Sequence, residues 1–327
     1  FITLAATRTD YNSLYTLVLL SVMFYMPTIA LSNSVAYNAL EKAGLDTVTH
    51  FPPIRVWGTV GFICAMWVVD LGKMGLSATQ LYFSATLGLI LGLYSFTLPN
   101  CPINRSGGGK SIVDLLGLRA FALFKQRKMA IFFIFSMLLG MSLQITNAFA
   151  DGYIKSFGDT GIHGAKYLGT FGVEHSTILI SLSQISETLC ILLIPFFLKR
   201  FGIKRVMLIA MFAWVLRFAL LGAGNPGPGV WMFILSMIVY GVAFDFFNIS
   251  GSLFVEKETS AAIRSSAQGV FMIMTNGLGA LIGSYLAGWV VNHYGWPLSW
   301  YLFAGFSLVV AIVFAVIFKY KHDPNRI

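Results

Sequence analysis

STILISLSQISETLCILLIPFFL, residues 176–198, is the stretch of sequence that decides the fold class. An α-helix crosses the hydrocarbon core of a bilayer with about 20 mostly apolar residues, and this stretch meets that requirement. Glu187 lies near its middle, three residues after Gln184. A charged carboxylate at that depth costs on the order of 3 kcal/mol. The stretch therefore predicts a transmembrane helix whose polar side chains face a protein interior or an aqueous cavity.

The composition of the whole chain extends this prediction. Of the 327 residues, 57% are hydrophobic and 11% are charged, and the mean hydropathy is +0.77. Because a soluble domain carries roughly 25% charged residues, we expect an all-α polytopic membrane protein. The net charge of +9 fits basic residues in cytoplasmic loops better than nucleic-acid binding, so no nucleic-acid partner is expected. The three cysteines form no C-x-x-C pair, and neither a disulfide framework nor a metal site is indicated.

Nine candidate spans follow an opening segment, FITLAATRTD, that looks like the tail of another span. Their approximate ranges are 13–39, 53–71, 79–98, 128–150, 176–198, 204–223, 229–254, 266–291 and 297–318. The longest connection, 99–127, is basic and separates three of these spans from six. This layout predicts a major facilitator fold, built from two halves of six helices, with about nine of the twelve transmembrane helices in residues 1–327 and three preceding residue 1.

The expected parts are the remainder of an N-terminal half (1–98), a cytoplasmic linker (99–127) and a C-terminal half (128–327). Lys and Arg set the orientation. The connections on one side of the predicted membrane hold 16 of these residues, and those on the other side hold four. Since basic residues favour the cytoplasmic side, the C-terminus is predicted to be cytoplasmic.

Polar and aromatic side chains share single faces of four predicted spans. Gln144 and Asn147 are three residues apart, which places them on one side of a helix. Gln184 and Glu187 have the same spacing. The two other sets are Arg55, Thr59 and Phe62 in span 53–71, and Tyr240, Phe244, Asp245 and Asn248 in span 229–254. The depths expected for these residues predict that they converge on one central cavity.

Simpler interpretations exist for most of these residues. Asparagine and glutamine side chains in membrane helices often form interhelical hydrogen bonds of about 0.6 kcal/mol. Thr59 can hydrogen bond to the backbone of its own helix, and phenylalanines usually pack against neighbouring helices. Arg55 can extend its charged group to the membrane interface. Glu187 fits such interpretations least well. Desolvation favours the neutral form of a buried carboxyl group, and a carboxyl group that changes its protonation in a cavity is a candidate for proton coupling. The residues do not decide between Glu187 and Asp245, and Arg217 stays unassigned.

The sequence carries no motif of an enzyme. GGGKS, residues 107–111, lacks the first glycine of a phosphate-binding loop, because position 104 is Asn. All five histidines fall in predicted loops or span ends, and neither HExxH nor GxSxG occurs. We therefore expect a secondary active transporter with no catalytic residues. The glycine pairs at 88 and 92 and at 279 and 283 predict close helix packing.

Several longer runs resemble the nucleoside:proton symporters of Gram-negative bacteria, a family within the major facilitator superfamily. These runs are FPPIRVWGT, LQITN, SQISETL, VYGVAFDFFNISGSLFVEKE and AIRSSAQG, and the resemblance extends along essentially the whole chain. It implies proton-driven uptake of purine and pyrimidine nucleosides across the inner membrane. Residues that match the family's binding cavity are Arg55, Thr59, Phe62, Gln144, Asn147, Gln184, Glu187, Tyr240 and Phe244, with Glu187 or Asp245 as the proton-coupling acid.

The chemistry of these residues suits a nucleoside, since aromatic rings stack on a base and amides both donate to and accept from its edge. The same residue types leave open a proton symporter for a sugar or another small polar metabolite, or a receptor of transporter fold. No cofactor is expected besides the proton as coupling ion. The expected setting is a monomer in the lipid bilayer of the bacterial inner membrane, spanning it several times. Residues 1–327 alone are not expected to transport, because half of the N-terminal bundle would be missing.

Overall fold

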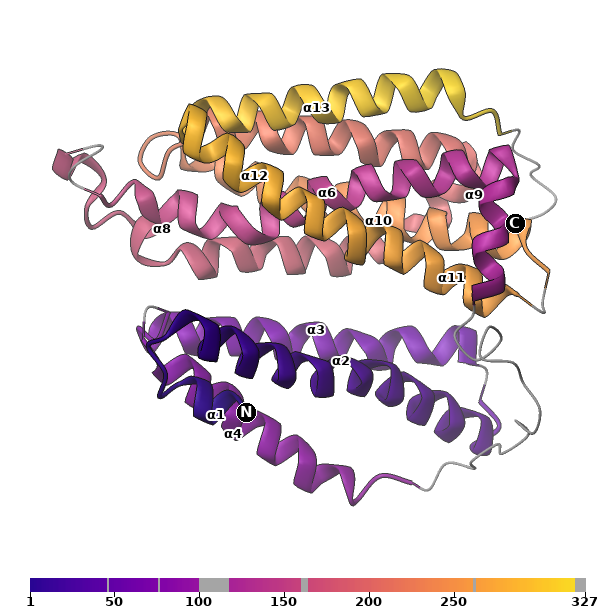
Figure 1. Ribbon diagram of the computed structural model, residues 1–327, viewed down its shortest axis with the longest axis horizontal. Helices are drawn as coiled ribbons and strands as arrows, with labels where there is room; N and C mark the ends of the chain where they lie inside the picture. The colour runs from indigo at the N-terminus through magenta and orange to yellow at the C-terminus, as the bar shows by residue number, and fades with distance from the viewer. Residues whose placement is uncertain (46, 76, 100–117, 160–163, 261–262, 321–327) are drawn as a thin grey trace. The chain divides into compact units, whose positions relative to one another are not determined.

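The structure is a computed structural model that describes residues 1–45, 47–75, 77–99, 118–159, 164–260 and 263–320. It divides into two compact units, Phe1–Gly108 and Gly109–Ile327, and each is described by itself. Figure 1 shows the helices of both units. The predicted linker, 99–127, lies mostly outside the described residues, so its ends stay a prediction.

Four helices make up the described part of the N-terminal unit. They are α1 (Ile2–Ala5), α2 (Tyr11–Lys42), α3 (Thr47–Leu71) and α4 (Thr79–Ser95). Helix α1 packs against α2 and α4, and α2 packs against α3. Asp10 caps α2, since its carboxylate accepts a hydrogen bond from the Ser13 backbone N–H at 2.8 Å. That bond holds the pKa of Asp10 below its ordinary value.

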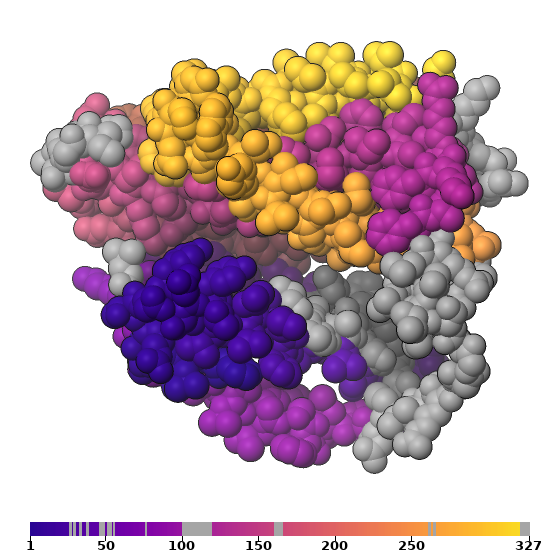
Figure 2. Space-filling view, viewed as in Figure 1, coloured from indigo at the N-terminus to yellow at the C-terminus, as the bar shows by residue number. Residues whose placement is uncertain are grey.

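The C-terminal unit is larger and holds most of the buried residues. Its elements are η1 (Leu118–Lys125), α6 (Arg127–Ser156), η2 (Gly164–Tyr167), α8 (Phe171–Glu174), α9 (Ser176–Ala223), α10 (Val230–Glu258), α11 (Arg264–Met272), η3 (Ile273–Gly279), α12 (Ala280–Tyr294) and α13 (Trp296–Ile317). Helix α9 packs along α10 and α13, and α6 packs against η3, α12 and α13. Helices α12 and α13 adjoin at the surface of this unit (Figure 2).

Every predicted span falls on a helix, which confirms the all-α polytopic membrane fold. Within the described ranges, α6, α9, α10, residues Ser266–Tyr294 and α13 are each long and apolar enough to cross a membrane. The predicted spans 176–198 and 204–223 form the two parts of α9, which kinks at Gly202. Gly202 has φ 75°, a left-handed conformation that side chains disfavour. The span predicted to end at residue 98 ends earlier, because α4 stops at Ser95.

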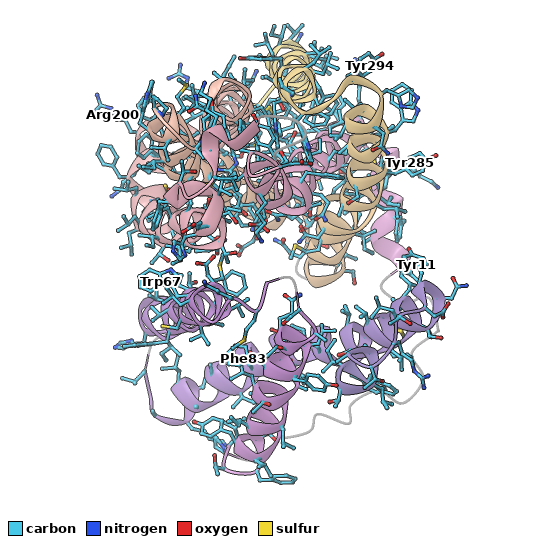
Figure 3. The ribbon with its side chains drawn as sticks, turned by 90° about the vertical axis from the view of Figure 1, so that its left-hand side faces the viewer. Tyr11, Trp67, Phe83, Arg200, Tyr285 and Tyr294 are labelled. Atoms are coloured by element: carbon cyan, nitrogen blue, oxygen red, sulfur yellow. The ribbon has the colours of Figure 1, made fainter. Side chains whose placement is uncertain are left out.

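Apolar side chains also cover the outer surface of the helices, as expected where lipid replaces water. Tyr285 on α12 is 77% exposed, and both Tyr285 and Tyr294 point outward from the C-terminal unit (Figure 3). The interior of this unit is aromatic instead. Phe132 is fully buried, and its ring centroid lies 4.6 Å from that of Phe254 and 5.4 Å from that of Phe271.

Glycines allow the closest helix contacts in the C-terminal unit. A Cβ atom on Gly283 would lie 2.7 Å from the Met141 Cα, so α12 touches the backbone of α6 there. This contact and the matching one at Gly279 confirm the packing predicted for that glycine pair. The packing predicted for Gly88 and Gly92 is not seen, since no heavy atom of the described chain lies within 4 Å of either position where a Cβ would stand.

Candidate functional site

Tyr240 stands at the centre of the polar cluster inside the C-terminal unit. It lies on α10, and its side chain is 4% exposed. Phe244 follows one helical turn later, and the two rings stack with centroids 5.8 Å apart and an interplanar angle of 20°. Trp214 of α9 meets the Tyr240 ring edge-on at 6.1 Å. Three aromatic rings from two helices thus form one continuous apolar wall.

Arg217 lies against the same tyrosine ring. Its guanidinium carbon is 4.6 Å from the Tyr240 ring centroid, a cation–π distance. Arg217 is 2% exposed, and its Nη1 donates a hydrogen bond of 2.6 Å to the Ser236 backbone carbonyl. The Ser236 hydroxyl donates in return to the Arg217 carbonyl at 3.1 Å. Arg217, left unassigned from the sequence, therefore joins α9 to α10 beside the candidate site.

The hydroxyl of Tyr240 interacts with side chains from three helices. It interacts electrostatically with Asn147 of α6, with Glu187 of α9 and with Asp245 of α10. Asp245 is 3% exposed, whereas Glu187 is half-buried. The structure therefore gathers Asn147, Glu187, Tyr240 and Asp245, which the sequence separates by almost 100 residues, around one phenol group.

The two glutamines of the predicted site lie one turn before members of this cluster. Gln144 precedes Asn147 on α6, and Gln184 precedes Glu187 on α9. Both side chains are half-buried. The expected helical faces are thus present, and the part of the glutamines in binding stays a prediction.

The remaining predicted residues belong to α3 in the N-terminal unit. Thr59 is half-buried and Phe62 is 54% exposed. The side chain of Arg55 lies outside the described part of the chain. The spacing of four and three residues keeps the set on one face of α3, and its contribution to a site shared with the C-terminal unit stays a prediction.

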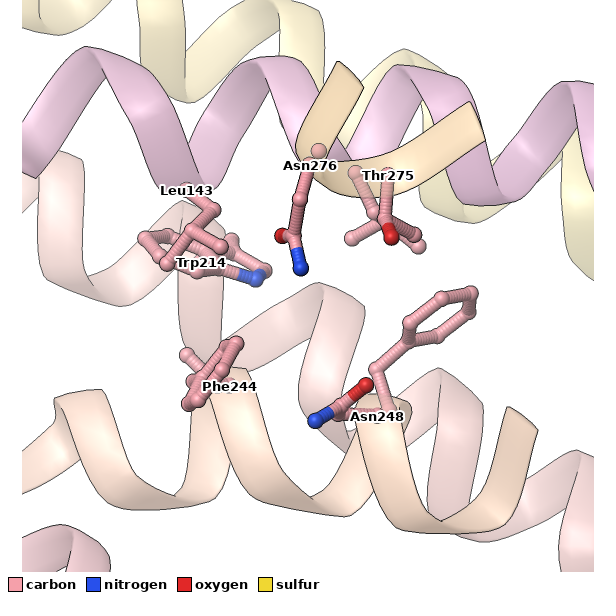
Figure 4. A pocket seen from close by; sticks show the side chains of 10 residues that line it. Leu143, Trp214, Phe244, Asn248, Thr275 and Asn276 are labelled. Carbon is pink, nitrogen blue, oxygen red and sulfur yellow. The ribbon is translucent and has the colours of Figure 1, made fainter. Parts of the chain in front are cut away.

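A small pocket adjoins the aromatic wall, and Figure 4 shows the side chains that line it. Phe244 and Trp214 belong both to the aromatic wall and to the lining of the pocket. The pocket has a free volume of about 20 Å³, and its lining residues are Leu139, Gly140, Leu143, Trp214, Ala243, Phe244, Phe247, Asn248, Thr275 and Asn276. That volume holds about one water molecule, which is much less than a nucleoside occupies.

Sequence reasoning missed Trp214, Thr275 and Asn276 as residues of this region, and it placed Asn248 on the polar face of its span without including it among the binding residues. The signal was present for two of them. Thr275 and Asn276 are adjacent polar residues inside the predicted span 266–291, and intramembrane polar residues usually face a protein interior. Trp214 carried no such signal, because one more aromatic residue in an aromatic-rich span is ordinary. Among the described residues, no cluster of three or more His, Cys, Asp or Glu side chains that could hold a metal ion is found.

Comparison with known proteins places this geometry in a family. A family model described as a nucleoside H⁺ symporter matches residues 1–323. The nucleoside permease NupG of Escherichia coli strain K12 is 52% identical over 326 residues, which cover 98% of this chain and 77% of NupG. The xanthosine permease of the same strain is 50% identical over 330 residues, 99% of this chain and 78% of that protein.

A solved structure gives the same result. The crystal structure of a mutant of the nucleoside transporter NupG matches this chain with a TM-score of 0.91 and 51% sequence identity. The match covers 97% of this chain and 80% of the NupG chain. The chain is an integral membrane protein and belongs to the nucleoside H⁺ symporter family.

Proposed function

We propose that the protein takes up nucleosides together with protons by alternating access. The observation that carries this proposal is the cluster around Tyr240, where stacked aromatic rings stand beside two carboxyl groups and an amide. The rings suit a flat base, and the carboxylates and amide suit ribose hydroxyls and base edges. Membership of a family of nucleoside H⁺ symporters supports the same conclusion.

The two acids, Glu187 and Asp245, supply the coupling in this proposal. A carboxyl group in a membrane cavity that takes up a proton on one side and releases it on the other links proton flow to transport. Both acids interact with the Tyr240 hydroxyl, so a change in the charge of either one alters the surroundings of that phenol group. In this proposal the side chains that contact the substrate also respond to the protonation of the two acids.

The proposal includes the setting of the transporter. The apolar outer surface fits a lipid bilayer, and the bacterial inner membrane, where a proton gradient is maintained, is the membrane we propose. The excess of Lys and Arg in one set of connections supports a cytoplasmic C-terminus. We propose that the transporter works as a monomer with no cofactor other than the transported proton.

A symporter for a sugar is the second candidate, because aromatic and acidic residues also bind sugars. The nucleoside is favoured by the relatives, which are a nucleoside permease and a xanthosine permease. The test is entry of radiolabelled uridine and adenosine into cells that lack other nucleoside uptake and express the full-length protein, with and without a protonophore. We expect protonophore-sensitive uptake that excess unlabelled nucleoside blocks and excess sugar does not.

Two outcomes would contradict the proposal. Uptake that ignores the protonophore would indicate facilitated diffusion instead of symport. A complete lack of nucleoside uptake, with the protein present in the membrane, would favour the sugar or another polar metabolite. One of the two variants Glu187→Gln and Asp245→Asn, which remove the ionisable group, is expected to lose protonophore-sensitive uptake.

A further inference from the structure

The pocket beside Phe244 is built on an unusual helical segment. Its polar residues Thr275 and Asn276 belong to η3, a π-helical segment between α11 and α12. Such wide turns inside α-helices occur frequently at functional sites. Here the segment is held firmly, because a Cβ atom on Gly279 would lie 2.5 Å from the Met137 carbonyl oxygen and 3.0 Å from the Gly140 Cα. The backbones of η3 and α6 are therefore in direct contact, which fixes the position of Asn276.

Two amide groups of the pocket keep hydrogen-bonding capacity for a ligand. The hydrogen bond that the structure gives to the Asn276 amide is a 3.8 Å contact from Nδ2 to the Met272 sulfur, a weak acceptor. No hydrogen bond within the described residues engages the Asn248 amide. The Thr275 hydroxyl is already used, since it donates to the Phe271 carbonyl at 2.9 Å. Figure 4 shows the Asn276 side chain extending into the space between η3 and α10, where Asn248 also lies.

The size of the pocket limits what these amides can bind. Its free volume of about 20 Å³ admits one group of the size of a water molecule. An exocyclic oxygen or amino group of a nucleobase has that size. A base stacked on the Phe244 side of the aromatic wall can place such a group between the two amides, which can donate to a carbonyl or accept from an amino group.

We propose that Asn276, together with Asn248, determines specificity by hydrogen bonding an exocyclic group of the nucleobase. The inference rests on the proposed nucleoside transport and adds the part of the substrate that this pocket recognises. A base that lacks an exocyclic group leaves both amides without a partner. Sites built to hydrogen bond a substrate group discriminate against an analogue that lacks this group.

The experiment compares three purine ribosides that carry different groups at C6. Inosine carries an oxygen there, adenosine an amino group and purine riboside only hydrogen. Initial rates of uptake into cells that express the full-length protein give KM for each. We expect the wild type to show a KM for purine riboside about five- to tenfold above the other two values, the loss of roughly one hydrogen bond. Asn276→Leu, similar in size but unable to hydrogen bond, is expected to bring all three KM values within about twofold of one another.

The matched control is Asn292→Leu, the same substitution at an exposed position of α12 outside the pocket, which is expected to keep the wild-type KM ratios. If Asn276→Leu does not reach the membrane, Asn276→Ser makes the same test, since its shorter side chain withdraws the amide. The inference would be overturned if the wild type had the same KM for purine riboside as for inosine and adenosine. It would also be overturned if an Asn276 variant kept the wild-type KM ratios or lost uptake of all three substrates equally. Absence of uptake of every nucleoside by the wild type would instead refute the proposed function.

Discussion

Gly140→Ala tests whether α6 and η3 are in tight backbone contact beside the pocket. The added Cβ atom would lie 2.7 Å from the carbonyl carbon and the Cα atom of Thr275, and closer still to the Thr275 carbonyl oxygen. An ordinary contact begins at 3.4 Å, so η3 must move away by about 0.7 Å to relieve the two carbon atoms and by more to relieve the oxygen. Because the neighbouring atoms are backbone, no side-chain rotation relieves the clash. Overpacking of this kind costs about 1–3 kcal/mol.

Alanine offsets part of that cost, since it favours a helix over glycine by about 1 kcal/mol. The control is Gly152→Ala on the same helix, where no heavy atom lies within 4 Å of the new Cβ. Thermal stability of the purified proteins in detergent is read from the temperature at which half the protein has aggregated. We expect Gly140→Ala to aggregate at a lower temperature than the wild type, and Gly152→Ala at the same or a higher temperature. Equal stability of Gly140→Ala and Gly152→Ala would refute the tight contact.

Two further substitutions probe the ionic contacts of the C-terminal unit. Arg217→Met removes a desolvated cation–π contact with Tyr240, worth about 2 kcal/mol. We therefore expect a raised KM for uridine, and we expect Arg217→Lys to retain part of the wild-type affinity. Unchanged uptake kinetics in Arg217→Met would contradict a positioning role for this contact. Lys128→Met breaks a partly exposed ion pair with Glu258, at 2.6 Å. Such pairs contribute about 0–1 kcal/mol, so the expected loss of thermal stability is small and decreases with added salt. A large loss of stability that salt does not change would contradict this prediction.

Much of the fold follows from the sequence because a bilayer restricts the choices. Apolar stretches of about 20 residues in lipid must be helical, since unpaired backbone groups are costly there. The positions of α10 and α13 were therefore predictable to within about four residues, whereas α6 continues to Ser156, beyond the predicted end at 150. The kink at Gly202 was expected only as a break between two spans, and its left-handed conformation was not.

The candidate site was only partly predictable. Spacing along a helix indicates which residues share a face, as for Tyr240 and Phe244, but not what the neighbouring helix places against that face. Arg217 illustrates the difference. Its sequence context, AWVLRFALL, indicates a buried cation, but the sequence does not indicate that the Tyr240 ring is its partner. The π-helical segment at 273–279 also has no clear periodic signal in the sequence, and its close backbone contact with α6, at Gly140 and Gly279, is visible only in the structure.

Proton coupling through Glu187 or Asp245 is the central claim, and transport by the full-length protein in liposomes tests it most directly. Two rates of radiolabelled uridine entry are compared for the wild type, Glu187→Gln and Asp245→Asn: accumulation driven by an inward proton gradient, and exchange against internal uridine with no gradient. Exchange returns the carrier loaded and requires no net release of protons. We expect one acid variant to lose gradient-driven accumulation while keeping exchange, which would identify the coupling residue. Gradient-driven accumulation that persists in both variants, or a wild type that does not respond to the gradient, would contradict the claim.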